Sequence, residues 1–306
     1  MTMHPDQFHV DAQTVRRLVE VQFPQWRGLP VTALSTLGTV NAIFRVGDDL
    51  AARFPLVGDD PPQVRASLVA EAEAARELAG VATVPTAVPV AIGEPGAGYP
   101  LPWSVQTWVS GHDATVEDPA GSKAFAHDLA ELIARMRAED TRGRRFGGVG
   151  RGGHLPDHDA WLETCFRQSE ELLDVPLLRR IWTGLRTLPE VDDDAMCHRD
   201  LIPPNLLVEE GRLVGVLDGG GFGPADPALD LVSAWHLLDE TPRGVLRREL
   251  GCGDVQWRRG MAWAFQQAMG LVWYYVDSNP TMSRWGKRTV GRVVDAWAAR
   301  AGTAPR

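Results

Sequence analysis

Several motifs that define common enzyme classes are missing from this chain of 306 residues. It has no GxxxxGKS/T phosphate loop, no HExxH zinc motif and no GxSxG nucleophile elbow, which argues against P-loop enzymes, zincins and serine hydrolases. One run, Gly148 to Gly153, formally matches GxGxxG. It follows an arginine-rich stretch and leads into His-Leu-Pro, whereas a dinucleotide fingerprint follows a strand and opens a helix. This run therefore predicts a flexible loop.

Cysteine and long apolar runs are also scarce. The three cysteines, Cys165, Cys197 and Cys252, form no CxxC pair, which favours reduced thiols over a disulfide framework or a zinc site. No apolar stretch approaches the ~20 residues that a membrane helix needs. The first ten residues have no basic stretch followed by an apolar run. We therefore expect a cytoplasmic protein without a membrane partner.

An excess of positive charge is missing as well. Lys and Arg number 31 against 40 Asp and Glu, for a formal net charge of -9. Because nucleic-acid binding draws on clustered Lys and Arg, we expect no nucleic-acid partner. The negative charge suits a cationic ligand, and it equally suits a surface that is only soluble. With 44% hydrophobic and 23% charged residues, the chain has an ordinary globular composition and is long enough for two lobes.

The first part of the chain predicts a small lobe of five strands. Helices are expected over residues 12–22 and 63–79, and strands within 32–55, 84–93 and 101–109. Gly38 marks the first turn between strands, where it could bring backbone N–H groups to a phosphate or form a plain hairpin turn.

A carboxylate interrupts the apolar stripe of the helix at 63–79. The stripe runs Val64, Leu68, Ala75 and Leu78, and its spacing includes Glu71. A buried carboxylate needs a cationic partner, and Arg53 in the preceding strand is the best one. The alternative is that Glu71 reaches water.

Beyond residue 107 the pattern becomes mainly helical, with helices expected over 122–138, 158–173, 176–188, 228–238, 257–277 and 285–300. The clear β element of this second lobe is a hairpin in the stretch 195–231. It would hold Asp200, Asn205 and Asp218 at one end. An Asp, an Asn and an Asp suit phosphoryl transfer, because one carboxylate can receive a hydroxyl proton while an amide and a carboxylate hold magnesium. The alternative is solvated loop polarity.

These residues resemble the aminoglycoside phosphotransferases, with macrolide kinases as close relatives. The specific block is His198-Arg-Asp200-Leu-Ile-Pro-Pro-Asn205, followed by Gly215-Val-Leu-Asp218 and Asp226-Pro-Ala-Leu-Asp230. The resemblance implies an α+β, bilobal, protein-kinase-like fold. It has an antiparallel N-terminal lobe with one helix (1–107), which binds the nucleotide, and a larger helical lobe (108–306) with the catalytic loop and substrate site.

The resemblance also implies residue roles. Asp200 would be the catalytic base, and Asn205 and Asp218 would bind Mg²⁺. Arg53 would contact the phosphates and pair with Glu71, and the backbone from Gln106 to Val109 would read the purine edge. The residues expected to hold ATP or GTP are Gly38, Asn41, Arg53, Glu71, Gln106 and Trp108. The residues expected to contact the acceptor are Asp230, Glu240, Trp273 and Asp277.

Structural alternatives exist for some of these residues. His198 would prop its loop, Asp226 and Asp230 could cap and pin the next helix, and Trp273 could pack in the core. The sequence departs from the family at Arg53, where kinases usually have Lys, and at Arg199, where antibiotic kinases have Gly. Gly219 to Gly221 replace a bulky residue.

The expected function is transfer of the γ-phosphate of ATP or GTP to a hydroxyl of an aminoglycoside-like or macrolide-like compound. One alternative is a metabolic kinase acting on a choline-, homoserine- or sugar-like alcohol. Another is a catalytically weak nucleotide-binding module, suggested by Arg53 and the glycine run. The expected partner is a hydroxylated small molecule, and the expected state is a monomer or weak dimer.

Overall fold

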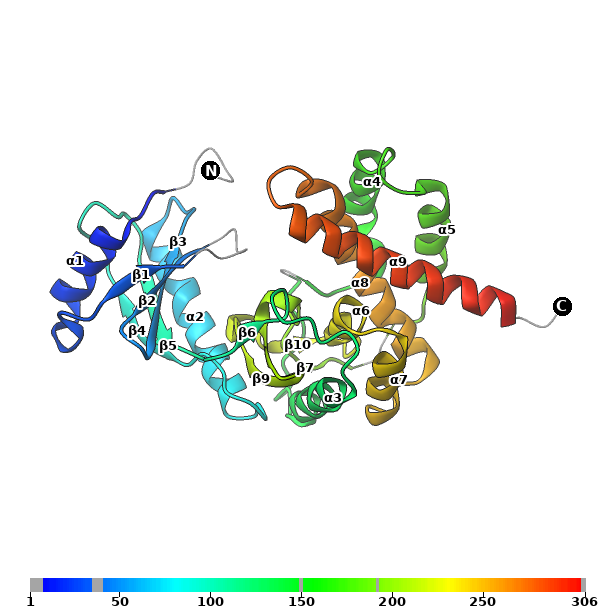
Figure 1. Ribbon diagram of the computed structural model, residues 1–306, viewed down its shortest axis with the longest axis horizontal. Helices are drawn as coiled ribbons and strands as arrows, with labels where there is room; N and C mark the ends of the chain where they lie inside the picture. Colours follow the sequence, from blue (N-terminus) through cyan, green and yellow to red (C-terminus); the bar gives the residue numbers. More distant parts are fainter. Residues whose placement is uncertain (1–7, 35–40, 149–150, 191–192, 304–306) are drawn as a thin grey trace. The chain divides into compact units, whose positions relative to one another are not determined.

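The computed structural model describes residues 8–34, 41–148, 151–190 and 193–303. The chain forms two compact units. The first contains residues 1–80, 85–110 and 215–221, and the second contains residues 81–84, 111–214 and 222–306. Strands form the sheet of the first unit, and helices dominate the second (Figure 1). The fold is α+β and kinase-like, as the sequence predicted.

The first unit is a five-stranded antiparallel sheet in the order β1-β2-β3-β5-β4. Its strands are β1 (Val31–Ala33), β2 (Asn41–Val46), β3 (Leu50–Pro55), β4 (Pro89–Gly93) and β5 (Trp103–Thr107). Its helices are α1 (Ala12–Gln22), the short η1 (Pro24–Trp26) and α2 (Pro61–Ala79). The predicted helix at 12–22 is confirmed, while the strand expected within 84–93 is shorter than predicted. Gly38 lies outside the described residues.

Aromatic packing builds the core of this sheet. The Phe54 ring stacks on Trp103 with centroids 4.8 Å apart, and Tyr99 meets Phe54 edge-on at 5.1 Å. All three side chains are almost completely buried. Such pairs add to the apolar burial that stabilises the sheet, so β3, which carries Arg53 one residue before Phe54, is firmly placed.

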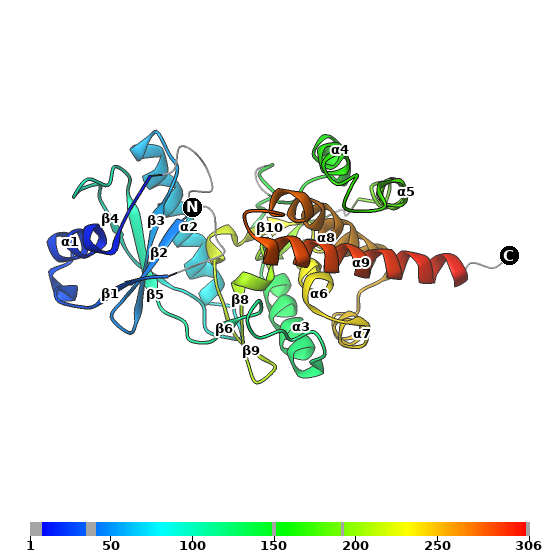
Figure 2. The same ribbon diagram turned by 45° about the horizontal axis from the view of Figure 1, so that its top comes forward.

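The second unit is built around a long central helix, α8, which packs against α9, α6, α4 and α5 (Figures 1 and 2). Its helices are α3 (Lys123–Ala138), α4 (Asp159–Gln168), α5 (Val175–Leu185), α6 (Val232–Leu237), α7 (Glu240–Glu249), α8 (Asp254–Tyr274) and α9 (Pro280–Thr303). Helix α7 was not predicted, because Pro242 and Gly244 resemble helix breakers. Pro242 lies in its first turn, where proline is tolerated, and α7 packs on α3.

Short strands and turns in this part of the chain hold residues 198–205, the loop that the sequence predicts to be catalytic and that is called the catalytic loop below. The predicted hairpin is present as β8 and β9, and β6 pairs with β8. A second pair, β7 with β10, was not predicted because its strands are three residues each. The strands are β6 (His112–Asp113), β7 (Ala195–Cys197), β8 (Leu206–Glu209), β9 (Arg212–Val216) and β10 (Gly223–Ala225). The short helices are η2 (Leu155–His158), η3 (Pro203–Asn205), η4 (Gly219–Gly221) and η5 (Leu229–Leu231).

Cys165, Cys197 and Cys252 are buried and free, in agreement with the expected reduced thiols. Within the described ranges, no helix has the length and apolar character needed to cross a membrane.

A buried histidine lies in the core of the second unit. His236 is 1% exposed on α6, with its Nδ1 2.9 Å from Thr289 Oγ1 on α9 and its Nε2 3.4 Å from Gln267 Oε1 on α8. Burial lowers the pKa of His236 from 6.5 to about 4, because the charged imidazolium would lose its water. The folded protein therefore holds this ring neutral, while the unfolded chain takes up a proton below pH 6.5.

This difference predicts an acid-sensitive fold. Between pH 6.5 and about pH 4, His236 should cost about 1.4 kcal/mol of unfolding free energy per pH unit as the pH falls. His236→Gln should flatten this part of the curve, measured by urea unfolding from pH 4 to 8. His112→Gln, at an exposed position, serves as the control. Equal slopes for wild type and His236→Gln would contradict the prediction.

Candidate active site

A buried carboxylate fixes the catalytic loop that follows β7. Asp230 accepts hydrogen bonds from the backbone N–H of His198 (2.8 Å) and of Arg199 (2.9 Å). Its side chain has no exposed surface. Burial raises the pKa of Asp230, while the nearby His198 and the two backbone hydrogen bonds oppose that shift. Since two charge-assisted bonds converge on one carboxylate, the start of the loop has little freedom.

The loop itself presents Asp200 and Asn205. The Asn205 amide nitrogen donates to the Asp200 carbonyl (2.9 Å), and the Asp200 N–H lies 3.3 Å from Nδ1 of the buried His198. His198 therefore supports the loop, as the structural interpretation expected. The Asp200 side chain stays 26% exposed and forms an ion pair with Arg151. The loop thus holds one carboxylate that keeps part of its surface exposed.

A second buried carboxylate, Asp226, anchors the segment after this loop to α8. It accepts hydrogen bonds from Arg259 (2.6 and 2.9 Å), from the Trp263 indole (2.7 Å) and from the Ala228 N–H (2.8 Å). The Arg259 and Asp226 side chains are each 3% exposed. Breaking such a pair strands a buried charge, so Asp226 holds the Asp230 segment against the central helix.

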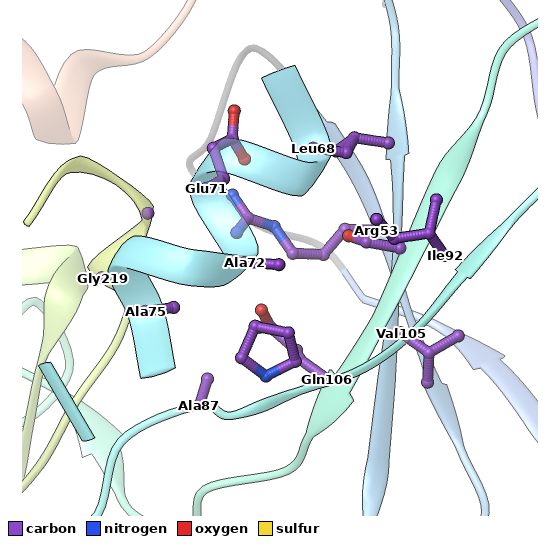
Figure 3. A pocket seen from close by; sticks show the side chains of 13 residues that line it. Arg53, Leu68, Glu71, Ala72, Ala75, Ala87, Ile92, Val105, Gln106 and Gly219 are labelled. Atoms are coloured by element: carbon purple, nitrogen blue, oxygen red, sulfur yellow. The ribbon is translucent and has the colours of Figure 1, made fainter. Parts of the chain in front are cut away.

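Asp218 lies on the first unit, where it pairs with Arg53. The Arg53 guanidinium on β3 lies 2.8 Å from the Asp218 carboxylate. The sequence predicted Glu71 as the partner of Arg53, whereas the ion pair that the structure shows is with Asp218. Glu71 lies on α2 with part of its side chain exposed, and Arg53 is near enough to attract it. It borders the same pocket, and Arg53 points toward it from the sheet (Figure 3). Loss of surrounding water raises the pKa of Glu71, while Arg53 lowers it.

Close packing of the glycine run on α2 explains why Asp218 takes this partner. A Cβ on Gly219 would lie 2.6 Å from Leu78 Cδ2, and one on Gly220 would lie 2.9 Å from Glu71 Cβ. Asp218 itself has a φ of 60°, a left-handed conformation. The glycines therefore let the turn η4 lie on the helix and direct Asp218 to Arg53. They are a packing requirement and do not make this segment pliant.

The pocket between α2 and the sheet contains several residues predicted to hold the nucleotide (Figure 3). Its lining residues are Arg53, Leu68, Glu71, Ala72, Ala75, Ala87, Pro89, Ile92, Ser104, Val105, Gln106, Gly219 and Gly220. Asn41 begins β2 and pairs with Pro55 in the neighbouring strand. The Trp108 N–H donates to the Asp49 carbonyl (2.7 Å), so in this structure it is not available to a purine.

The predicted acceptor residues fall into separate places. The structure contradicts the predicted contact between Asp230 and the acceptor. Asp230 is completely buried and bonded to the catalytic loop, which leaves no surface for a substrate. Glu240 is exposed at the start of α7. Trp273 is half-buried near the end of α8, where its ring lies 6.1 Å from Trp161, and Asp277 is exposed in the turn after it.

One contact was missed from the sequence altogether. Arg151, which lies 49 positions before Asp200, belongs to the glycine-rich run that was interpreted only as a flexible loop. No periodic pattern connects two such loops, so the ion pair was not predictable. The glycines at 152 and 153, which suggest a tight path of the chain, were the available signal.

These features define a protein with a kinase-like fold. One unit has a five-stranded sheet with a pocket between the sheet and α2, and the other is helical and has a catalytic loop held by buried carboxylates. A sequence profile of the phosphotransferase enzyme family matches residues 36–263. The chain belongs to this family.

Similar proteins agree with this assignment. An aminoglycoside 3'-phosphotransferase of Streptomyces fradiae is 33% identical over 168 residues, covering 49% of this chain and 59% of the relative. The uncharacterized protein YcbJ of Bacillus subtilis is 29% identical over 158 residues, covering 48% and 47%. The matches therefore span about half the length of these curated relatives.

Solved structures show the same fold. The GDP complex of aminoglycoside 2'-phosphotransferase-IIIa aligns over 94% of this chain and 100% of that chain, with a TM-score of 0.71 and 20% identity. A macrolide 2'-phosphotransferase of Brachybacterium faecium aligns over 86% and 94%, with a TM-score of 0.57 and 19% identity. At these identities the likeness is one of fold.

The role of Asp230 can be tested through stability. Asp230→Ala should lower the free energy of unfolding by about 2 to 5 kcal/mol, because two buried N–H groups lose their acceptor. Asp230→Asn keeps one acceptor oxygen and should lose less. Asp118→Ala breaks the exposed pair with Arg288 and should cost about 0 to 1 kcal/mol. Urea unfolding gives all three values, and an Asp230→Ala variant as stable as Asp118→Ala would refute the role.

Proposed function

We propose that this protein is a small-molecule kinase that transfers the γ-phosphoryl group of ATP or GTP to a hydroxyl group. The observation that supports it most is the catalytic loop, in which Asp230 and His198 hold a partly exposed Asp200 in a fixed position. Phosphoryl transfer depends mainly on positioning and charge stabilisation, which such a loop supplies.

In this reaction Asp200 orients the acceptor hydroxyl and receives its proton. On the nucleotide side, Arg53 supplies a positive charge for the phosphates, in a guanidinium that stays charged and binds two oxygens at once. The pocket that Arg53 lines also presents Gln106 and Val105. We propose Gly38 and Asn41 as the cover of the phosphates and Gln106 as a contact near the base.

The cofactor we propose is Mg²⁺, with Asn205 and Asp218 as protein ligands. The Asn205 amide nitrogen donates to the Asp200 carbonyl, which leaves the amide oxygen to act as a metal ligand. The Asp218 carboxylate is 44% exposed. Amide and carboxylate oxygens are the donors that Mg²⁺ prefers. When bound, the ion would neutralise phosphate charge.

The acceptor we propose is an aminoglycoside-like or macrolide-like antibiotic, as the names of the relatives and of the structural neighbours suggest. Trp273 and Asp277, at the end of α8, offer an aromatic surface and a negative charge for it. One observation favours a second candidate, a kinase for a simpler metabolic alcohol. Asp230 is buried and Arg151 pairs with Asp200, so neither of these two carboxylates offers an uncompensated, exposed negative charge to a polycation.

A ligand screen separates the two candidates. Thermal shifts would be measured with aminoglycosides, macrolides and simple amino alcohols in the presence of Mg-ATP or Mg-GTP, since a bound ligand raises apparent stability with its occupancy. Nucleotide consumption would then be measured for each compound that binds.

Removal of the base gives a direct test. Asp200→Asn should lower turnover by ~10²–10⁴ and leave nucleotide affinity nearly unchanged, because the amide cannot accept the proton. The measurement is steady-state transfer together with nucleotide titration, and Asp118→Asn is the control in the same unit. An Asp200→Asn variant with the turnover of wild type would remove Asp200 from the mechanism.

A further inference from the structure

The catalytic loop carries no positive charge between Asp200 and Asn205, where it reads Leu-Ile-Pro-Pro, and Arg199, the residue before Asp200, lies against the Phe146 ring. Arg53, the cation described above, belongs to the first unit and is paired with Asp218. In phosphoryl transfer, negative charge spreads over the oxygens of the migrating group, and a cation placed there accelerates the reaction strongly. A cation from another segment, in addition to Arg53 and the proposed Mg²⁺, would therefore favour the reaction.

Arg151 brings that charge to the base. Its guanidinium forms an ion pair with the Asp200 carboxylate, and both side chains keep part of their surface exposed, 43% for Arg151 and 26% for Asp200. Among the described residues, the buried Asp200 Oδ1 has no hydrogen-bond partner, and Arg151 supplies the positive charge next to it. Arg151 thus lies beside the carboxylate that the proposed function makes the catalytic base.

The local structure holds the loop of Arg151 in place. Gly152 and Gly153 have φ values of 132° and 79°, and a Cβ on Gly152 would lie 2.8 Å from the Phe146 ring. Phe146 is fixed in turn, because its N–H donates to Asp194 (2.7 Å) and the Arg199 guanidinium lies 5.0 Å from its ring centroid. The Phe146 ring therefore links the residue before Asp200 to the residue after Arg151.

A further bond holds the other side of the loop. The Gly152 carbonyl lies 3.1 Å from Nε2 of His158, whose ring packs edge-on against Trp263 on the central helix. The residue after Arg151 is thus held between the Phe146 ring and the His158 ring.

We propose that Arg151 is a catalytic residue that stabilises the migrating phosphoryl group. The inference rests on the proposed function. The acceptor oxygen attacks the γ-phosphorus while the bond from that phosphorus to the bridging oxygen of the nucleoside diphosphate breaks. The hydroxyl proton passes to Asp200, and the diphosphate leaves with the electron pair of the broken bond. Arg151, released from Asp200 by that protonation, donates to the phosphoryl oxygens.

The same contact allows one opposite interpretation, in which Arg151 only blocks the base. The two interpretations predict rate changes of opposite sign when the guanidinium is removed. Water can serve as the acceptor, so the test does not wait for the natural substrate.

The experiment measures consumption of Mg-ATP and Mg-GTP, with water and with the best alcohol from the screen, by wild type, Arg151→Ala and Arg151→Lys. We expect Arg151→Ala to lower kcat by ~10³–10⁵ with nucleotide KM changed less than about threefold, because the charge acts in the transition state. Arg151→Lys should recover part of the loss, since it keeps the charge without the planar fork. Arg145→Ala, from the same loop and paired with Asp193, should stay near wild type.

A second pair of variants leaves Arg151 in place. Gly152→Ala should reproduce much of the loss, because its Cβ would push against Phe146 and move the loop. Gly148→Ala, at a backbone φ of 74° with nothing within 4 Å of its Cβ, is the matched control, because it carries the same kind of backbone strain without the contact. Unfolding midpoints establish that all variants are folded.

The outcomes are distinct. An unchanged kcat in Arg151→Ala overturns the inference, and a raised kcat overturns it in favour of a blocking role, while either result leaves the kinase assignment intact. A wild-type protein that consumes no nucleotide with any acceptor overturns the proposed function and the inference with it.

Discussion

The catalytic loop depends on one constraint: the Asp230 carboxylate binds two consecutive backbone N–H groups, at His198 and Arg199. A carboxylate in this position fixes the backbone of the loop, and the fixed backbone sets the direction in which the next side chains extend. Asp226, four residues earlier, attaches the same segment to Arg259 and Trp263 of the central helix. Burial makes these carboxylates costly, and the bonds they accept offset that cost.

In the first unit a charged side chain is also held in position, but it is less deeply buried. Arg53 extends from a strand whose neighbour Phe54 is stacked in the core, so the stem of the cation is firmly held while its head reaches Asp218. The Arg53–Asp218 ion pair satisfies both charges within the first unit. In the proposed reaction, Arg53 would exchange Asp218 for a phosphate, and Asp218 would exchange Arg53 for a metal ion.

Much of this architecture could be predicted from the sequence. The apolar alternation of β2 and β3, the stripe of α1 and the Asp-Asn-Asp block around the hairpin are local signals, and the structure contains each of these elements. Contacts between distant segments could not be predicted. Arg53 takes Asp218 and not Glu71, Asp230 faces the backbone and not a substrate, and Arg151 reaches Asp200. In each case tertiary packing brings the two partners together, and no periodic pattern in the sequence indicates their contact.

The turn after Asp218 has a consequence for how this part of the molecule can move. Gly219 and Gly220 touch Leu78 and Glu71 with no room for a single methyl group. The helix α2 therefore cannot rotate about its axis or slide along the sheet without carrying Asp218 along. Helix, turn and carboxylate form one mechanical part, and any ligand that displaces the helix also displaces the carboxylate that would hold its metal ion.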